Sequence, residues 1–552
     1  MKASNLNWIE MMKRAIYIFL FSLCWLTSMA QSAELMRIYT DKECYLAGEE
    51  LWVKVCVDDE ALPGNGMSRV AYVEICDAAQ VRAQGKVSLT EGTGWACIRL
   101  PQTMHSGMYR LTAYTNYMRN LKPDCFPSRH VAVINARTVS NEDNLVRNDS
   151  AAFHKDWESE MPAQKSHLLV SDKQVYGLRE KVSLEWSSHL KDAKELTLSV
   201  VRKDCEVLMS QPEVASSEPA QGERWVAECE GHIVSARVVG DNLPEYLLTQ
   251  LSCVGKEMNM YEGKKKAEGL YRFYTHGVTG QQDIVLSAQS NEGKAYRMEL
   301  ISPFAELLPK QVPDLYCLYQ DSALIVRSVA LQLAQAMPKA VSSKKLEEII
   351  YGQLPSKTYN LDEYVRFNTV EECIIEFVMG AAINKQGDRR IIRMLKEDAK
   401  DYNDFPILVL VDGVAFYNHD EVLAYNARQV QYIHQYRGRY VMGETVYGGI
   451  LSLITHRGTM PDMRINDDMQ MLAYEFPQER PAFELPKYED AESKASRKPD
   501  FRHTMYWNPT VEGKDSVEFY TSDLEGTYVA TLQGVLEDGK KVEVKCEFEV
   551  KR

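Results

Sequence analysis

The sequence predicts a mainly β protein with an α+β part. Two tandem β-sandwiches are followed by a helical connector, a small α+β domain and a C-terminal β segment. Three observations predict this. A polar motif at residues 41–49 recurs 131 positions later, at 172–180. Each copy precedes a run of alternating apolar residues, which indicates a strand with one buried face. Turn sequences rich in Gly, Pro, Asn and Ser separate such runs through residues 34–302, as is typical of sandwiches.

The repeated motif has the form Asp-Lys-x-x-Tyr followed by a glutamate. The first copy supplies Asp41, Lys42, Tyr45, Gly48 and Glu49. The second copy supplies Asp172, Lys173, Tyr176 and Glu180, and it has Arg179 in place of the glycine. A pattern repeated in this way indicates a duplicated structural unit. Tandem β-domains usually bind or space other molecules, so the repeat favours a binding or scaffolding role.

Composition places the chain among ordinary globular proteins. It has 552 residues, of which 45% are hydrophobic and 26% charged. A chain of this length holds roughly three to five domains. The combination of low hydrophobicity and high net charge that marks disordered chains is absent from the composition.

The N-terminus predicts an export signal at residues 1–30. Lys13 and Arg14 precede an apolar stretch over residues 15–26, and residues 28–30 are a small-x-small cleavage site. A retained membrane anchor is the alternative, although the apolar run is short for a span. Removal of residues 1–30 changes the net charge from −14 to −16, which argues against nucleic acid or an anionic membrane surface as partner. The exported part is expected to be soluble, in the periplasm or associated with the outer membrane.

Eleven cysteines follow residue 30, an odd number with scattered positions. This spacing is unlike a dense disulfide framework. We interpret most of these cysteines as small core residues, with one disulfide as an open alternative.

The expected domains follow one another along the chain. Their ranges are 34–135 for the first sandwich, 136–165 for a linker, 166–302 for the second sandwich, 303–355 for the helical connector, 356–460 for the α+β domain, 461–499 for a Pro-rich tether and 500–552 for the C-terminal β segment. The last segment is short for an independent sandwich. We therefore expect it to dock on another domain or to be completed by one.

Helices are expected in the connector and at the start of the α+β domain. Residues 316–337 have helical spacing of apolar residues, and Ser342 or Ser343 would cap a second helix through Ile350. A third helix begins at a capping box formed by Thr369 and Glu372. Beyond it we expect strands at 381–384, 390–395, 405–414, 431–436 and 450–456 and a short helix at 420–425.

The sequence predicts no catalytic, cofactor-binding or metal-binding residue. It lacks the HExxH, GxSxG and GxxxxGK[ST] motifs. Several residues have two interpretations. Glu372 and Glu376 form either a carboxylate pair or a solvated face, and Cys125 and Cys373 are either nucleophiles or core residues. Asp412 is either a metal-binding or catalytic aspartate or a turn residue, and Arg502 with Trp507 form either a binding spot or packing contacts. The second interpretation is favoured in each case.

The repeated motif, together with residues 106–111 (Ser-Gly-Met-Tyr-Arg-Leu), resembles macroglobulin-like domains of the alpha-2-macroglobulin superfamily. Segment 406–458 is similar to the plug domain of TonB-dependent outer-membrane receptors. The matching residues are Asp412 and Gly413 at a turn and Gly448 and Gly449 at the start of a strand. The tail, with Asp500, Arg502 and Trp507, looks like the β tail of multi-domain envelope proteins that combine these parts.

The chain departs from both families in ways that bear on function. None of its cysteines is followed by Gly-Glu-Gln, so the reactive macroglobulin thioester is missing. The 94 residues after Gly458 are too few for a receptor barrel of about 22 strands. The resemblance therefore implies a non-enzymatic scaffold or protein-interaction module. Its expected partner is an envelope protein, with an outer-membrane receptor among the candidates. The alternatives are an accessory binder of peptide or glycan for an outer-membrane transporter, and a hydrolase whose site only the fold assembles.

Overall fold

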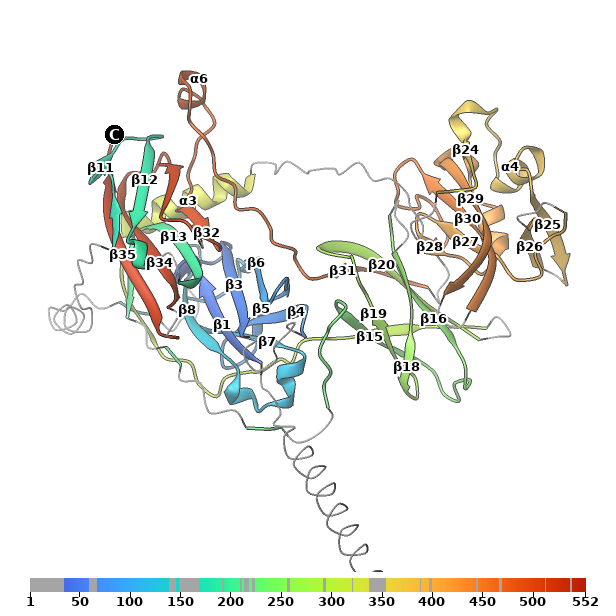
Figure 1. Cartoon of the computed structure of the whole chain (residues 1–552), viewed down its shortest axis with the longest axis horizontal. Helices are drawn as coiled ribbons and strands as arrows, with labels where there is room; N and C mark the ends of the chain where they lie inside the picture. The colour runs from blue at the N-terminus through green and yellow to red at the C-terminus, as the bar shows by residue number, and fades with distance from the viewer. Residues whose placement is uncertain are drawn as a thin grey trace, which may run out of the picture.

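The computed structural model describes residues 34–552, apart from several gaps. The gaps are residues 59–66, 139–144, 148–167, 191–192, 209–210, 213–217, 221–223, 256–258, 291–293, 320, 337–353, 388, 397–399, 443–444, 466–468, 512 and 537–538. Most described elements are strands (Figure 1), which confirms the mainly β fold class. Within this part of the chain, no helix has both the length and the apolar character needed to cross a bilayer.

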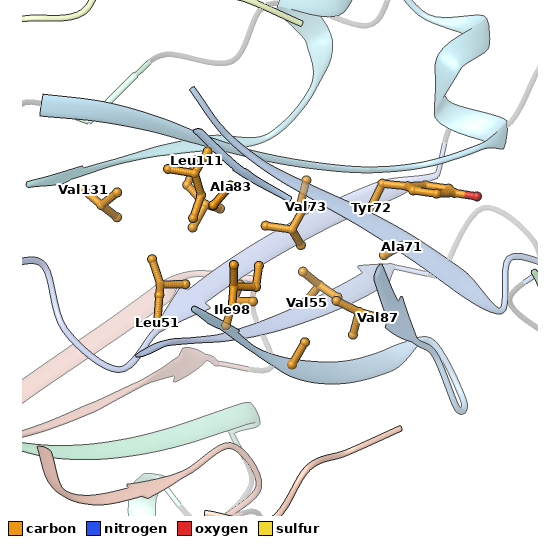
Figure 2. Close-up of a cluster of buried hydrophobic side chains, with 14 of the residues drawn as sticks. Leu51, Val55, Ala71, Tyr72, Val73, Ala83, Val87, Ile98, Leu111 and Val131 are labelled. Carbon is orange, nitrogen blue, oxygen red and sulfur yellow. The ribbon is translucent and has the colours of Figure 1, made fainter. Parts of the chain in front are cut away.

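The first sandwich occupies residues 35–134 and contains two sheets. One sheet has the order β1 (Leu35–Thr40), β3 (Glu50–Asp58), β6 (Thr93–Arg99). The other has the order β2 (Cys44–Leu46), β8 (Ser128–Ile134), β7 (Gly107–Thr115), β4 (Val70–Cys76), β5 (Val81–Ser88). Alternate apolar side chains such as Leu51, Val55, Val73 and Leu111 face each other between the sheets and form the core (Figure 2).

The second sandwich repeats this topology strand for strand. One sheet has the order β10 (Leu169–Ser171), β12 (Lys181–Trp186), β33 (Ser516–Tyr520). The other has the order β11 (Val175–Tyr176), β35 (Lys541–Val550), β34 (Gly526–Val535), β13 (Lys194–Arg202), β32 (Thr504–Asn508). The parallel pair of the first sandwich, β2 with β8, has its counterpart in β11 with β35. Residues 203–503 are therefore an insertion between the fourth and fifth strands of the second sandwich.

This topology corrects the expected sandwich at 166–302. Residues 169–202 pair with the C-terminal strands. The short C-terminal β segment is therefore completed into a sandwich by these earlier strands. Residues 233–301 belong to a third sandwich instead. The sequence pattern could not reveal this division because alternation specifies which face of a strand is buried, not which strand lies beside it. The entropic cost of closing a loop also grows slowly with loop length, so a long insertion is tolerated.

The third sandwich lies between the paired sandwiches and the α+β domain (Figure 1). Its first sheet has the order β18 (Lys264–Ala267), β19 (Leu270–Tyr274), β15 (Ile233–Val238), β22 (Met298–Ile301). Its second has the order β17 (Asn259–Glu262), β16 (Leu248–Cys253), β20 (Gln281–Gln289), β21 (Ala295–Tyr296), with β31 (Gln470–Glu475) also paired to β20. β31 corrects the expectation that residues 461–499 form an unpacked tether, because Leu472 and Tyr474 pack on the third core.

A small sheet and a helix connect these domains. The sheet has the order β14 (Cys205–Leu208), β23 (Leu315–Tyr319), β9 (Leu145–Arg147), so a strand lies within the expected linker 136–165. The helix is α3 (Asp321–Ala336). The helix expected from residue 316 thus begins later, because Leu315 and Cys317 alternate into an apolar cluster with Val207 and Ile134. The second expected connector helix, at 342–350, lies outside the described residues.

The α+β domain contains most of the elements expected between 356 and 460. Its sheet has the order β24 (Lys357–Asn360), β29 (Val430–Met442), β30 (Thr445–Thr455), β27 (Leu408–Val411), β28 (Val414–Ala415). A hairpin of β25 (Ala381–Gln386) and β26 (Arg389–Met394) and the helices α4 (Val370–Glu376) and α5 (His419–Leu423) accompany it. The predicted capping box of Thr369 and Glu372 is present. Val285 of the third sandwich belongs to this domain's core, so the two domains pack together.

Short helical turns complete the described elements. They are η1 (Tyr117–Asn120), η2 (Pro123–Cys125), η3 (Ser188–Leu190), η4 (Leu361–Glu363), η5 (Ala427–Gln429) and α6 (Ala491–Lys494).

Candidate functional site

The two motif copies form the same hydrogen bonds. The Tyr45 hydroxyl donates to Asp41 Oδ1 at 2.8 Å, and the Tyr176 hydroxyl donates to Asp172 Oδ1 at 2.6 Å. Each of these carboxylate oxygens also accepts the backbone N–H eleven positions further along the chain, at 3.1 and 2.8 Å respectively. The motif therefore holds the turn between the first two strands of a sandwich against the third strand.

The motif glutamates and lysines complete the turn. Glu49 Oε2 accepts a backbone N–H three residues earlier at 3.2 Å, and Glu180 Oε2 accepts one at 2.5 Å. Lys42 Nζ lies 3.1 Å from Glu49 Oε2, and Lys173 pairs with Glu180 in the same way. Both copies are thus structural, which agrees with the motif's occurrence at the same place in two domains.

A further repeated contact occurs on the seventh strand of each sandwich. The Tyr109 hydroxyl donates to the His105 carbonyl at 2.9 Å, and the Tyr528 hydroxyl donates to the Leu524 carbonyl at 2.9 Å. A tyrosine that bonds back to the preceding corner is a known feature of sandwich folds. This hydrogen bond is evidence, independent of the motif, that the two sandwiches are duplicates.

The buried copy of the motif is expected to contribute more stability than the exposed copy. Tyr45→Phe removes a donor from Asp41, which is almost fully buried. We expect it to lower the free energy of unfolding by about 1.5–3 kcal/mol, the contribution of a hydrogen bond to a charged group. Tyr176→Phe is the matched control and is expected to cost about 1 kcal/mol or less, because Asp172 is accessible to water. Urea unfolding of both variants measures the difference, and equal costs would contradict this assignment.

The departure from the motif at Arg179 has a structural explanation. Gly48 and Arg179 both have positive φ, at 94° and 54°, a conformation that favours glycine. Arg179 is held there by Asp523, with Nε to Oδ1 at 2.8 Å and Nη2 to Oδ2 at 2.6 Å. Its Nη1 also donates to the carbonyls of Lys494 and Ser496, at the end of α6. The arginine therefore fastens the loop that leads into the last strands.

A cluster of buried charges surrounds Arg327 of α3. Its guanidinium donates to both Glu49 oxygens at 2.7 Å and to Asp204 Oδ1 at 3.0 Å. His503 Nε2 lies 2.9 Å from Asp204 Oδ2. The hydroxyl of Thr504, the residue after His503, donates to Asp41 Oδ2 at 2.9 Å. This hydrogen bond links the first motif copy to the cluster. We call these residues the Arg327 joint, because they bring together the first sandwich, the second sandwich and α3.

The electrostatics of the Arg327 joint follow from burial and charge. Burial would raise the pKa of Glu49, but the positive charge of Arg327 outweighs it and holds that pKa well below its ordinary value. Burial likewise opposes ionisation of Asp204, yet the neighbouring Arg327 and His503 lower its pKa to about 2. Both carboxylates are thus ionised at neutral pH. A single helix residue, which sequence reasoning did not select, organises the polar motif.

A second joint fastens the third sandwich to the outer face of the first. Buried Glu74 of β4 accepts the backbone N–H groups of residues 305, 306 and 307 at 2.9–3.2 Å. The Tyr72 hydroxyl donates to Glu228 Oε2 at 2.8 Å, and His232 lies 3.1 Å from Glu228 Oε1. The other ring nitrogen of His232 lies 2.6 Å from the Tyr474 hydroxyl. Glu74, Tyr72, Glu228 and His232 are buried, and Tyr474 is partly buried, so the contacts position domains.

In the α+β domain the predicted residues are structural too. Asp412 and Gly413 have positive φ, at 44° and 79°, in the tight turn between β27 and β28. Asp412 Oδ1 accepts the N–H of Thr455 at 2.7 Å. A Cβ on Gly448 would lie 2.3 Å from Cγ of Asn403, and one on Gly449, 2.9 Å from Met394 Sδ. The turn interpretation of Asp412 is therefore the correct one, and the glycines permit close packing.

The tail residues make contacts within the second sandwich and, through Trp507, with the first sandwich. Asp500 and Arg502 form an ion pair at 2.6 Å. Trp507 is only 2% exposed, and its ring centre lies 5.1 Å from that of Trp52 in the first sandwich. Beside them, Glu195 of the second sandwich accepts Arg37 Nε at 2.8 Å. The packing interpretation of Arg502 and Trp507 is therefore the one that fits.

Among the other chemical candidates, Glu372 and Cys373 have structural roles. Glu372 Oε2 accepts the backbone N–H groups of residues 368 and 369 as part of the helix cap. Cys373 is buried, and burial raises the pKa of its thiol to about 11, so it is a poor nucleophile at neutral pH. Across the described ranges, no group of three or more His, Cys, Asp or Glu side chains is arranged to hold a metal ion.

An accessible groove of about 660 Å³ lies beside β5, the edge strand of its sheet. Its walls are β5 with the preceding turn, the segment 304–308 and Glu475. Gln478 pairs with the outer side of β5, since its N–H donates to the Lys86 carbonyl and its carbonyl accepts the Ser88 N–H, both at 2.9 Å. Alternation in an antiparallel ladder then places the peptide groups of Gln84 on the same outer side, facing the groove.

Comparison with known proteins gave structural similarities only. No family model matches the chain, and no curated protein matches it. Among solved structures, the chain is similar to the Escherichia coli adhesin FdeC (13% identity, 52% of this chain and 65% of that chain, TM-score 0.15). It is also similar to methylamine-reacted Salmonella alpha-2-macroglobulin (10%, 94% and 23%, 0.15) and native E. coli alpha-2-macroglobulin (8%, 95% and 40%, 0.22).

These similarities are weak, and the chain spans less than two thirds of the length of each of those chains. With TM-scores between 0.15 and 0.22, they do not assign the chain to a family. The fold assignment rests on the strand pairing: tandem β-sandwiches of one repeated topology, with a third sandwich and an α+β domain carried in an insertion.

Proposed function

We propose that the chain is a non-enzymatic, exported cell-envelope protein that acts as a rigid scaffold and binds a partner protein. In this proposal the duplicated sandwiches are macroglobulin-like domains and residues 356–460 are a plug-like domain without a barrel. The observation that carries the proposal is that the motif residues and other buried charged residues make contacts within the chain itself. The charged groups of the Arg327 joint, and those of the second joint formed by Glu74, Glu228 and their partners, are engaged in contacts within the chain. A protein built in this way holds its domains in fixed positions.

Partner binding is assigned to the groove beside β5. An edge strand exposes backbone donors and acceptors that an extended segment of another protein can pair with, while side-chain pockets give specificity. Arg82 lies on one wall, and Glu306 and Glu475 lie on the others. Lys86 also lines the groove, but it is buried and its ammonium group donates to the Glu475 carbonyl. The groove thus offers both charges, and an extended segment with polar side chains of mixed sign suits it. The expected partner is an envelope protein, with an outer-membrane receptor as the first candidate.

Blocking the edge tests this function. Gln84→Pro removes an N–H group on the outer side of β5 without removing a bond to β4, and proline is tolerated on edge strands. We expect capture of the partner from envelope extracts to fall at least about tenfold, which corresponds to about 1.4 kcal/mol of binding free energy. Quantitative mass spectrometry of affinity-purified material measures this.

Gln84→Ala is the matched control, since it keeps the N–H group and should capture the partner as the wild type does. Unfolding of Gln84→Pro in urea checks that the sandwich is intact. Failure of the wild-type chain to retain any envelope protein would contradict the proposed function. Equal capture by wild type and Gln84→Pro would contradict the binding mode.

The alternative of an accessory binder for peptide or glycan is not favoured by the residues that suggested it. Those residues are Tyr506, Trp507, Tyr520 and Tyr528. Tyr506, Trp507 and Tyr528 are 4%, 2% and 0% exposed, and the partly exposed Tyr520 packs edge-on against the ring of Tyr488 at 5.8 Å. They therefore pack within and between the sandwiches and do not line a ligand pocket.

A further inference from the structure

Three cysteine sulfur atoms meet where the first sandwich contacts the small connecting sheet. They belong to Cys44 of β2, Cys205 of β14 and Cys317 of β23. Cys205 Sγ lies 2.8 Å from Cys317 Sγ and 3.3 Å from Cys44 Sγ. All eleven described cysteines are unbridged in the structure. The three residues are more than 110 positions apart from each other in the sequence, so only the fold brings them together.

The strand register explains why Cys205 and Cys317 face each other. In the antiparallel pair of β14 and β23, Cys205 is opposite Tyr319, and Cys317 is opposite Val207. The two cysteines are therefore diagonal neighbours, and the two-residue period of a strand puts both side chains on one face of the sheet. That face packs on Leu46 and Ile134 of the first sandwich.

We propose that Cys205 and Cys317 form a disulfide that fastens the insertion to the first sandwich, and that Cys44 remains a thiol beside it. An S–S bond is about 2.05 Å long, so the pair at 2.8 Å needs a smaller movement than the pair at 3.3 Å. Cys205 is partly exposed, whereas Cys44 and Cys317 are buried, so an oxidant reaches the pair through Cys205.

The reaction requires an oxidant, which we assign to the class of thiol–disulfide oxidants. One thiolate of the pair attacks a disulfide R–S–S–R and releases one thiol R–SH. The second thiolate then attacks the mixed disulfide, forms the Cys205–Cys317 bond and releases the second R–SH. Two protons and two electrons leave the protein in total. Hydrogen bonding to a neighbouring sulfur, together with burial, raises the pKa of both Cys205 and Cys44, so a pH at or above the ordinary thiol pKa favours the reaction.

The bond would join two residues 112 positions apart and close a loop that contains β15–β22 of the third sandwich. It would also fix β23, directly before α3, so it would brace the Arg327 joint covalently. Stable disulfides form in oxidising compartments such as the bacterial periplasm. The inference concerns the folded chain itself and does not depend on the partner proposed above.

Peptide mapping of the purified full-length chain tests the assignment. The chain is equilibrated with oxidised glutathione at a pH of about 8.5, near the ordinary pKa of a thiol, then quenched with acid and alkylated. We expect a cross-linked peptide pair that contains Cys205 and Cys317, about 2 Da lighter than the two free peptides together, with Cys44 alkylated. Incubation with dithiothreitol should remove the cross-link.

Variants decide between the two sulfur pairs. Cys44→Ser should keep the cross-link, and Cys317→Ser should lose the Cys205–Cys317 peptide. Cys253→Ser, in the third sandwich, is the matched control and should behave as wild type. The peptide map of the wild-type chain tests the proposal even if a variant fails to fold. Independent alkylation of Cys205 and Cys317 after oxidation, or a cross-link of Cys205 to Cys44 in the wild type, would overturn the proposal.

Discussion

Arg327→Met is expected to destabilise the chain by about 3–5 kcal/mol, the cost of leaving a buried charge without its partner. The Arg327 side chain is 2% exposed, and it neutralises Glu49 and Asp204, whose side chains are 7% and 2% exposed. The substitution also removes a donor from the Cys44 carbonyl. Urea unfolding measures the effect, and limited proteolysis should show earlier cleavage near α3.

Two comparisons show whether unpaired charge is the cause. Arg99→Met removes a partner from Glu50 in an ion pair whose arginine side chain is 62% exposed, and pairs of that kind contribute about 0–1 kcal/mol. The triple variant Arg327→Met, Glu49→Gln, Asp204→Asn removes the two carboxylates together with the arginine. It should recover part of the lost stability. A single variant as stable as Arg99→Met would contradict the central role of the Arg327 joint.

Acidification is expected to weaken the same joint through His503. A carboxylate only accepts hydrogen bonds, so the neutral imidazole donates from Nε2 to Asp204. Burial and the neighbouring positive charge of Arg327 lower the pKa of His503 to about 4, from an ordinary value of about 6.5. Between these values the unfolded chain binds a proton that the folded chain does not. The free energy of unfolding therefore falls as the pH is lowered from 6.5 to 4, by at most about 3 kcal/mol.

The carboxylates of the joint extend this loss to lower pH. The pKa of Asp204, at about 2, lies below the value of an unfolded aspartate, so its contribution is lost as the pH falls through that range. His503→Gln keeps a donor toward Asp204 but cannot titrate, and it should flatten the dependence between pH 6.5 and 4. His189→Gln, at an exposed position, should leave the profile unchanged. Identical profiles for wild type and His503→Gln would contradict this prediction.

Several elements could be predicted from the sequence because their causes are local. The Asp-Lys-x-x-Tyr motif identified both sandwich repeats, since the Tyr45 and Tyr176 hydroxyls bond to aspartates only four residues away. The capping box at Thr369 and the Asp412 turn depend on neighbouring backbone groups in the same way. Each of these patterns specifies dihedral angles or a buried face within a few residues.

The functional interpretation was harder to predict because the informative contacts are long-range. Arg327 has no motif around it in the sequence, yet it contacts Glu49, 278 positions away. Trp507 offered both a binding and a packing interpretation, and only its contact with Trp52 decided between them. The groove beside β5 likewise depends on a segment and a strand end that lie more than 200 residues further along the chain.

By itself, the sequence determined the mainly β class, the duplicated polar turn and most strands and helices of the α+β domain. Only the tertiary structure decided that residues 203–503 interrupt the second sandwich and that the chain's last strands return to complete it. Alternating side chains determine which face of each strand is buried, but several strands present equally apolar faces. Which strands pair with each other depends on the arrangement that buries all of these apolar faces and pairs the buried charges at the joints.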